Sequence, residues 1–257
     1  MNSFFDLIDE LESHRHYHCV DEMIKIALDM SDVDGEFVGE GMYGAFYTDF
    51  NQEEKRKLKQ KLGRIPDDIG IKRYTYPKGD IRLNVGENLA VIYIAPYIKQ
   101  QTSFKTPEFT GNLSLAGMIS NGLIVSQKMP GVNIETAFGD DDDDLGTAFL
   151  GHLASDITRQ SIEKQLSNIG VVTRDMHSNN FFVQPEQIKK IKEQYESGES
   201  IQYDLSEGAS LFDFGLMRVK RGTPPGQQLE QLKGKLISKS ELGLFKTIIR
   251  VIEDMLI

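Results

Sequence analysis

Cysteine is almost absent from this chain, and long apolar runs and a secretory start are absent too. Cys19 is the single cysteine, which excludes an intrachain disulfide and suits folding in a reducing compartment. The longest apolar run, Leu89 to Ile98, is interrupted by Pro96 and is far shorter than the ~20 residues that span a bilayer. The first residues, Met1 to Asp6, lack the basic segment of a secretory signal. These absences predict a cytoplasmic protein without membrane insertion.

Positive charge is also scarce relative to negative charge. The chain has 29 lysines and arginines against 39 aspartates and glutamates, which gives a net charge of −10. Nucleic acids and anionic membranes bind to positive protein surfaces, so this balance argues against a general binder of either. With 39% hydrophobic residues and 257 residues in all, the chain can form one large domain or two lobes around a proper core.

What the chain does contain is a polar turn between two apolar segments, from Val171 to Val183. Within this turn Asp175 is followed five positions later by Asn180. A carboxylate and an amide on one loop between two strands can place a proton acceptor beside a metal ligand. Phosphoryl transfer needs this kind of positioning and charge neutralisation, with little covalent chemistry.

Three glycines, Gly39, Gly41 and Gly44, have a spacing that lets the backbone approach phosphate oxygens. A dinucleotide-binding fingerprint has the same spacing, but its third glycine opens a helix. Here the β-prone residues Ala45 to Thr48 follow, so the pattern predicts a strand-turn-strand flap. The alternative is a glycine-rich hairpin that binds no ligand.

A second candidate metal ligand is Asp213, which follows an apolar segment and precedes Phe214 and Gly215. An aspartate at a strand end, beside a flexible glycine, matches the Asp-Phe-Gly motif that binds magnesium. An isolated tripeptide of this kind also occurs as a simple strand end with a glycine turn.

Taken in chain order, these motifs resemble those of protein kinases over roughly residues 36 to 220. The matching features are the glycine-rich flap, the hinge-like strand 123–128 that ends before Met129-Pro130-Gly131, the Arg-Asp…Asn loop and Asp-Phe-Gly. The resemblance implies an α+β class and a bilobal protein kinase-like fold with a β-rich N-lobe and a reduced helical C-lobe. The expected division is an N-terminal helical extension at 1–35, an N-lobe at 36–130 and a C-lobe at 131–257.

The same resemblance assigns ATP and Mg²⁺ as cofactors and gives the catalytic-loop residues their roles. Asp175 would accept the proton of the acceptor hydroxyl, and Asn180 and Asp213 would hold Mg²⁺. His177 would contact the γ-phosphate in place of the lysine found there in Ser/Thr kinases.

The nucleotide-binding residues are assigned in the same way. Lys72 would pair with the α- and β-phosphates, with Lys99 as its rival, and Glu87 would orient it. The three glycines of the flap would cover the phosphates. Backbone groups of Gln127 to Met129 would bind the adenine edge.

Departures from the kinase pattern bear on the acceptor. Thr173 stands where protein kinases have histidine, and His177 creates an Asp-x-His-x-x-Asn order that is typical of aminoglycoside and choline kinases. The short segment after Gly215, without an Ala-Pro-Glu motif, resembles the minimal kinases delivered by bacterial type III secretion. Such an effector would act in a host cytosol.

We therefore predict an ATP- and Mg²⁺-dependent phosphotransferase, with a protein serine or threonine favoured as acceptor. A small-molecule phosphotransferase and a nucleotide-binding pseudokinase are the alternatives. The expected partners are a protein substrate and an activating protein, because the short C-lobe leaves the core less supported.

Apolar periodicity and turn residues predict the remaining elements. Helices are expected at 3–30, 51–63, 87–101 with a kink at Pro96, 147–169, 185–197 and 244–256, and strands at 69–74 and in a hairpin at 113–128. Loops are expected at the acidic run 140–144 and at the basic, Pro/Gly-rich segment 219–226. The segment His14 to Cys19 could hold a metal, but a polar helix surface is the simpler interpretation.

Overall fold

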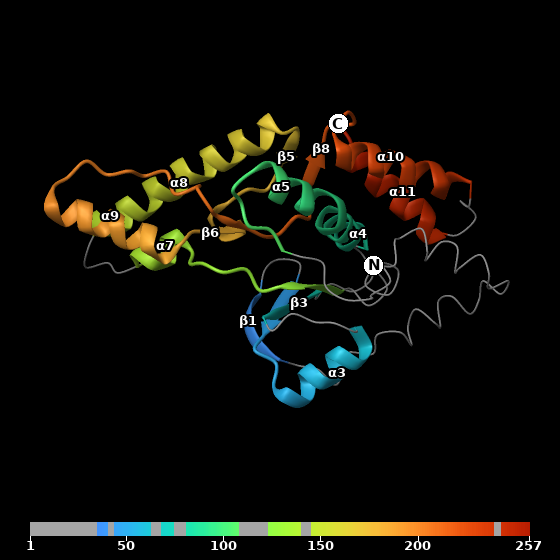
Figure 1. Cartoon of the computed structure of the whole chain (residues 1–257), viewed down its shortest axis with the longest axis horizontal. Coiled ribbons are helices and arrows are strands. Elements are labelled where there is room, and N and C mark those ends of the chain that lie inside the picture. Colours follow the sequence, from blue (N-terminus) through green and yellow to red (C-terminus); the bar gives the residue numbers. More distant parts are fainter. Residues whose placement is uncertain are drawn as a thin grey trace. The chain divides into compact units, whose positions relative to one another are not determined.

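The computed structural model describes residues 35–40, 44–62, 68–74, 81–107, 123–139, 145–238 and 243–257. It is a mixed α+β structure, mostly helical with small sheets (Figure 1). The chain forms two compact units: unit 1 comprises Met1–Asn88 and Glu108–Lys128, and unit 2 comprises Leu89–Pro107 and Met129–Ile257. The sequence-based division at 1–35, 36–130 and 131–257 remains a prediction.

Unit 1 is built on a four-stranded antiparallel sheet in the order β1-β2-β3-β4. Its strands are β1 Glu36–Glu40, β2 Gly44–Thr48, β3 Ile69–Tyr74 and β4 Leu123–Gln127, with helices α3 Gln52–Leu62 and α4 Ile81–Leu89. The core of this unit is formed by buried residues of the strands, of both helices and of the segment between β2 and α3: Ala45, Phe50, Leu58, Ile69, Ile71 and Val85. The flap predicted from the glycine spacing is present as the β1–β2 hairpin, with a register irregularity between Phe37 and Gly39.

The helix predicted at 87–101 begins earlier, at Ile81, and its irregularity lies before Pro96 rather than at it. After α4 comes a π-helical stretch, η1 Ala90–Ile94, and then α5 Ala95–Gln101, with Pro96 in its first turn. The N–H of Ala95 donates to the carbonyl of Ala90, five residues back. Proline has no N–H for an α-helical hydrogen bond, but it is tolerated in the first turn of a helix. The π-helical hydrogen bonds before Pro96 therefore let a new α-helix begin at Ala95, with the proline in its first turn.

Unit 2 contains α8, the longest of the described helices, and the short strands that carry the site. Its remaining elements are α7 Ile134–Phe138, α8 Leu145–Asn168, β5 Val171–Thr173, η2 Ser178–Asn180, β6 Phe181–Phe182, α9 Pro185–Ser197, β7 Ser210–Leu211, β8 Met217–Val219, α10 Pro224–Ile237 and α11 Gly243–Met255. One apolar stripe of α8 is buried, as its periodicity predicts: Leu150, Ala154, Ile162 and Leu166.

The helices predicted from apolar periodicity are present in the structure, whereas one predicted loop is partly helical. The structure contains α3, α8, α9 and α11 where helices were expected, and α9 has the predicted bounds. The predicted loop 219–226 is wrong at both ends, because Val219 belongs to β8 and α10 begins at Pro224. Thr223 caps that helix by accepting a hydrogen bond from the N–H of Gly226, and proline is favoured in a first turn.

Several predictions fall outside the described residues. They concern the helices at 3–30 with the His14 to Cys19 segment, Gly41, the first strand and turn of the hairpin at 113–122, and the acidic run 140–144. Among the described helices, none combines the length and the hydropathy needed to cross a bilayer.

Candidate functional site

Two loops of unit 2 are held opposite one another by the strands that flank them. One loop, residues 174–180, joins β5 to β6, and the other, residues 212–216, joins β7 to β8. Strand β5 pairs with β8, and β6 pairs with β7, both antiparallel. Each loop is therefore fastened to the other at both of its ends, and the Asp175–Asn180 segment is brought to the Asp-Phe-Gly segment.

Asn180 is the link between the two loops. Its backbone carbonyl accepts a hydrogen bond from the N–H of Phe212 at 3.1 Å, and Phe212 precedes Asp213 directly. Its side chain, which is buried, donates through Nδ2 to the backbone carbonyl of Asp175. Since the amide nitrogen is used in this way, the amide oxygen is the end of the side chain that can bind a cation.

Asp213 has an unusual backbone conformation. Its φ is +61°, and only Asp49 shares a positive φ among the non-glycine residues that the structure describes. Aspartate tolerates this region better than most residues, yet the conformation is still costly and persists only where the surroundings enforce it. The residues before and after Asp213 are both packed. Phe214 is buried, and the ring centroid of Phe212 lies 4.4 Å from that of Phe182. The carboxylate accepts from the N–H of Gly215 at 3.4 Å and is exposed.

Asp175 is exposed at the start of its loop. Its N–H donates to the Thr173 hydroxyl at 3.4 Å, so the threonine that replaces the expected histidine helps to hold the loop backbone. The next residue, Met176, is buried and anchors the loop to the core. A carboxylate that is accessible while its backbone is fixed can meet an incoming hydroxyl group.

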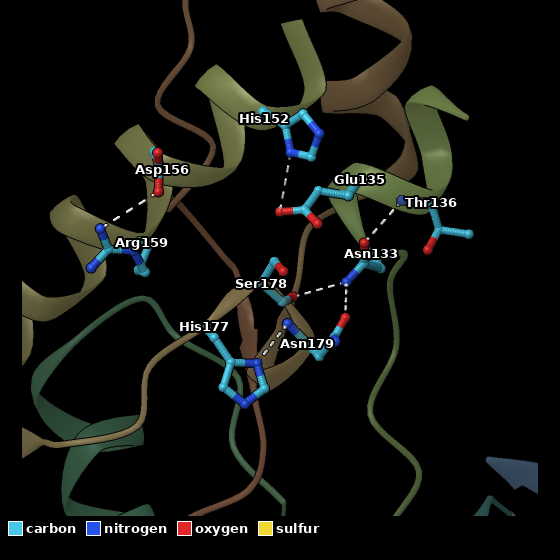
Figure 2. Close-up of polar contacts among 9 residues, drawn as sticks. All are labelled: Asn133, Glu135, Thr136, His152, Asp156, Arg159, His177, Ser178 and Asn179. Atoms are coloured by element: carbon cyan, nitrogen blue, oxygen red, sulfur yellow. Dashed lines mark hydrogen bonds and ion pairs between the residues drawn. The ribbon is translucent and has the colours of Figure 1, made fainter. Parts of the chain in front are cut away.

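His177 caps the short helix η2 that contains Asn180. Its Nδ1 accepts a hydrogen bond from the N–H of Asn179 at 3.2 Å (Figure 2). In the neutral ring the proton then lies on Nε2, so the outer nitrogen of this exposed side chain is a donor. This arrangement suits contact with an anionic oxygen, which is the role the sequence predicted for His177.

In unit 1, Lys72 on β3 forms an ion pair with Glu87 on α4. The Nζ–Oε2 distance is 2.7 Å, and the side chains are 20% and 6% exposed. The pairing that the sequence predicted is therefore present, although the contact of Lys72 with phosphates stays a prediction. The rival residue, Lys99, lies exposed on α5.

Replacing Lys72 with methionine should lower the free energy of unfolding by about 2–4 kcal/mol, because Glu87 loses its ion-pair partner in a poorly solvated position. Denaturant unfolding measures this change. Adding Glu87→Gln should restore part of the loss, and strictly additive effects of the two substitutions would contradict the coupling. Arg56→Met is the matched control, since the Arg56–Glu53 pair is more than half exposed and its loss should change the free energy of unfolding much less.

The hinge-like segment after β4 is held by two aspartates of unit 1. The N–H of Lys128 donates to the carbonyl of Asp68 at 2.7 Å, and Gln127 Nε2 donates to the Asp68 carboxylate at 3.0 Å. The Lys128 ammonium pairs with Asp49 at 3.0 Å. The N–H of Lys128 is thus already used within the protein, and the binding of adenine by backbone groups of Gln127 to Met129 stays a prediction.

The same contacts affect the ionisation of Asp49. Hydrogen bonds from the Thr48 hydroxyl and the Lys128 ammonium hold the pKa of the Asp49 carboxyl below its usual value. Neither aspartate was among the predicted site residues, since an isolated aspartate in a loop carries no sequence signal for such a contact.

Asn133 is a further residue that the sequence analysis missed. It caps α7 and contacts the loop of Asp175 and Asn180 through its side-chain amide (Figure 2). An asparagine before Ile134-Glu135 is an ordinary helix-start signal, but the capping pattern does not reveal what else the amide reaches.

The residues present fit Mg²⁺ better than a metal enclosed by protein ligands. No group of three or more His, Cys, Asp or Glu side chains suited to a metal occurs in the described part of the chain. Magnesium is commonly held by one or two protein oxygens together with water and substrate phosphates. The Asn180 amide oxygen and the Asp213 carboxylate are a donor pair of this kind.

No protein-family model and no curated protein matches the chain. Among solved structures, the complex of Rv3197 with erythromycin from Mycobacterium tuberculosis is similar over 96% of this chain and 62% of that one, with 11% identity and a TM-score of 0.37. WbdD, crystallised with the kinase inhibitor LY294002, is similar over 85% of this chain and 45% of that one, with 14% identity and a TM-score of 0.33. The chain thus spans less than two thirds of the length of either protein, and no function is drawn from them.

Proposed function

We propose that this chain is an ATP- and Mg²⁺-dependent phosphotransferase of the protein kinase-like type. The observation that carries the proposal is the pairing of β5 with β8 and of β6 with β7, which holds the Asp175–Asn180 loop against the Asp213 loop. Sequence motifs alone could occur by chance in unrelated places. Motifs that are fastened together by two strand ladders form one candidate site.

The roles follow from the chemistry of each side chain. Asp175 accepts the proton of the acceptor hydroxyl and aligns that group with the γ-phosphorus. Asn180 and Asp213 hold Mg²⁺, and the ion when bound neutralises charge on the phosphates. His177 donates from Nε2 to a phosphate oxygen.

Unit 1 supplies the groups proposed for nucleotide binding. Lys72, oriented by Glu87, gives a positive charge for the α- and β-phosphates. The hairpin β1–β2 carries Gly39 and Gly44 at the ends of the flap proposed to cover those phosphates, with Gly41 between them. Backbone groups of Gln127 and Met129 bind the adenine edge.

We further propose a protein hydroxyl as the acceptor, with action in a cytoplasm and an activating protein as a partner. A small-molecule acceptor is the second candidate. It is favoured by His177, which gives the loop its Asp-x-His-x-x-Asn order. Both reactions use the same residues in the same roles and differ only in what the exposed Asp175 carboxylate meets.

Incubation of the 257-residue chain with γ-labelled ATP, Mg²⁺ and a cell extract should label protein bands. Label found only on small molecules would favour the second candidate. A thermal shift caused by Mg²⁺-ATP without any labelled product would indicate a nucleotide-binding pseudokinase. If no label is transferred and Mg²⁺-ATP causes no thermal shift, the proposed function is contradicted altogether.

A further inference from the structure

Asn133, the residue before α7, uses its side-chain amide in two directions at once. Its Oδ1 accepts a hydrogen bond from the N–H of Thr136 at 3.0 Å and so caps α7. Its Nδ2 donates to the backbone carbonyl of Ser178 at 2.9 Å and to Oδ1 of Asn179 at 3.0 Å (Figure 2). One side chain therefore joins the start of a helix to the short helix η2.

The backbone next to Asn133 is itself fixed on the same part of unit 2. Val132 and Val183 exchange two hydrogen bonds, each of 3.0 Å. Val183 follows β6, whereas Ser178 and Asn179 precede it. The backbone next to Asn133 is thus hydrogen-bonded to the residue that follows β6, while the Asn133 side chain contacts η2, which precedes β6. Asn133 therefore restrains η2 from a segment that is itself fixed.

The restraint on Ser178 and Asn179 bears directly on Asn180. Asn180 is the next residue of η2, and its N–H donates to the carbonyl of His177 at 2.9 Å. The N–H of Asn179 is bound by Nδ1 of His177. Since η2 has only three residues, a change in the backbone of Ser178 or Asn179 acts directly on the residue that carries the Asn180 side chain.

An amide is the side chain that this position requires. Serine, threonine and aspartate cap helices as well as asparagine does, because capping needs only an acceptor. None of them can also supply two N–H donors to a neighbouring carbonyl and amide oxygen. Capping of α7 and restraint of η2 are therefore separable by substitution.

We propose that Asn133 is a positioning residue that holds η2 so that the Asn180 amide oxygen is presented for Mg²⁺. This role rests on the proposed function. Residues that orient metal ligands typically change metal affinity by about 10- to 100-fold when replaced.

The test uses Asn133→Ser in the full chain, since serine keeps the helix cap and removes both donors to η2. Amide hydrogen exchange, measured without nucleotide or Mg²⁺, should become about tenfold faster at Asn180. The Mg²⁺ concentration for half-maximal ATP turnover should rise about tenfold or more, while the unfolding temperature stays close to that of the wild type. Glu135→Gln is the control: Glu135 lies on α7 beside the cap, its contact is with His152 of α8, and its replacement should change neither quantity.

Each outcome decides a different point. Unchanged exchange at Asn180, or faster exchange with an unchanged Mg²⁺ requirement, would overturn the positioning role. Absence of any Mg²⁺-dependent turnover in the wild type would overturn the proposed function, and the exchange rates would still decide whether Asn133 restrains η2. If Asn133→Ser fails to fold, Asn179→Ala removes one of the two contacts with the cap intact and should shift both quantities in the same direction.

Discussion

Replacing Asp213 with asparagine should reduce Mg²⁺-dependent ATP turnover by about 10³-fold or more, because stabilisation by a metal ion contributes several kcal/mol and ~1.4 kcal/mol is a factor of ten in rate. Asparagine tolerates the positive φ of this position, so the substitution removes the charge with little effect on the backbone. Asp213→Ala should abolish turnover as well, with an additional cost of about 1 kcal/mol in stability, since alanine is disfavoured at this φ.

Turnover measured across a range of Mg²⁺ concentrations tests this prediction. The loss should include a weaker response to Mg²⁺ and not only a lower maximum. Asp156→Asn is a suitable control, because Asp156 lies exposed on α8, where its carboxylate pairs with Arg159. Turnover that survives Asp213→Asn unchanged would show that the Asp-Phe-Gly segment is not a metal site.

Replacing Asp175 with asparagine should lower the chemical step by about 10²–10⁴-fold while leaving ATP binding intact. Asparagine keeps the size of the side chain and cannot accept the proton of the acceptor hydroxyl. The backbone contacts of Asp175, to the Thr173 hydroxyl and from the Asn180 amide, do not involve the carboxylate and should persist.

Single-turnover kinetics measures the chemical step, and the thermal shift with Mg²⁺-ATP measures binding. The two aspartates should thus give different signatures, since only Asp213 should alter the Mg²⁺ response. Asp204→Asn provides a surface control in unit 2. If Asp175→Asn transfers phosphate as fast as the wild type, the proton acceptor must be another group.

The local elements of this protein could be predicted from the sequence because their signals are local. Helix α9 has proline in its first turn and Gly198 at its end, where φ is +72°, and these signals predict its observed bounds. The start of helix α10 differs from the prediction, although Pro224 carries the same signal. The Pro- and Gly-rich composition of this segment indicates a loop, whereas Thr223 caps a helix there.

The candidate site could be predicted only as separate pieces. Strands β6 and β7 have two residues each and β5 and β8 three, which is too short for any periodic pattern. Their pairing partners lie between 28 positions (Phe182 and Ser210, 210 − 182) and 48 positions (Val171 and Val219, 219 − 171) apart in the chain. The same limit applies to the Asn133 contact, since its capping role is visible in the sequence and its donors to η2 are not.

The sequence by itself determined which residue types are available for chemistry: an acidic chain, a glycine flap, Asp175 and Asn180 on one loop, and Asp213 on another. Only the tertiary structure decided that the two loops face each other, that Lys72 meets Glu87 and that Asn133 restrains η2. The physical reason is that motifs and helix signals arise from neighbouring residues. Strand register and side-chain contacts across the fold depend instead on the packing of segments that are distant in sequence.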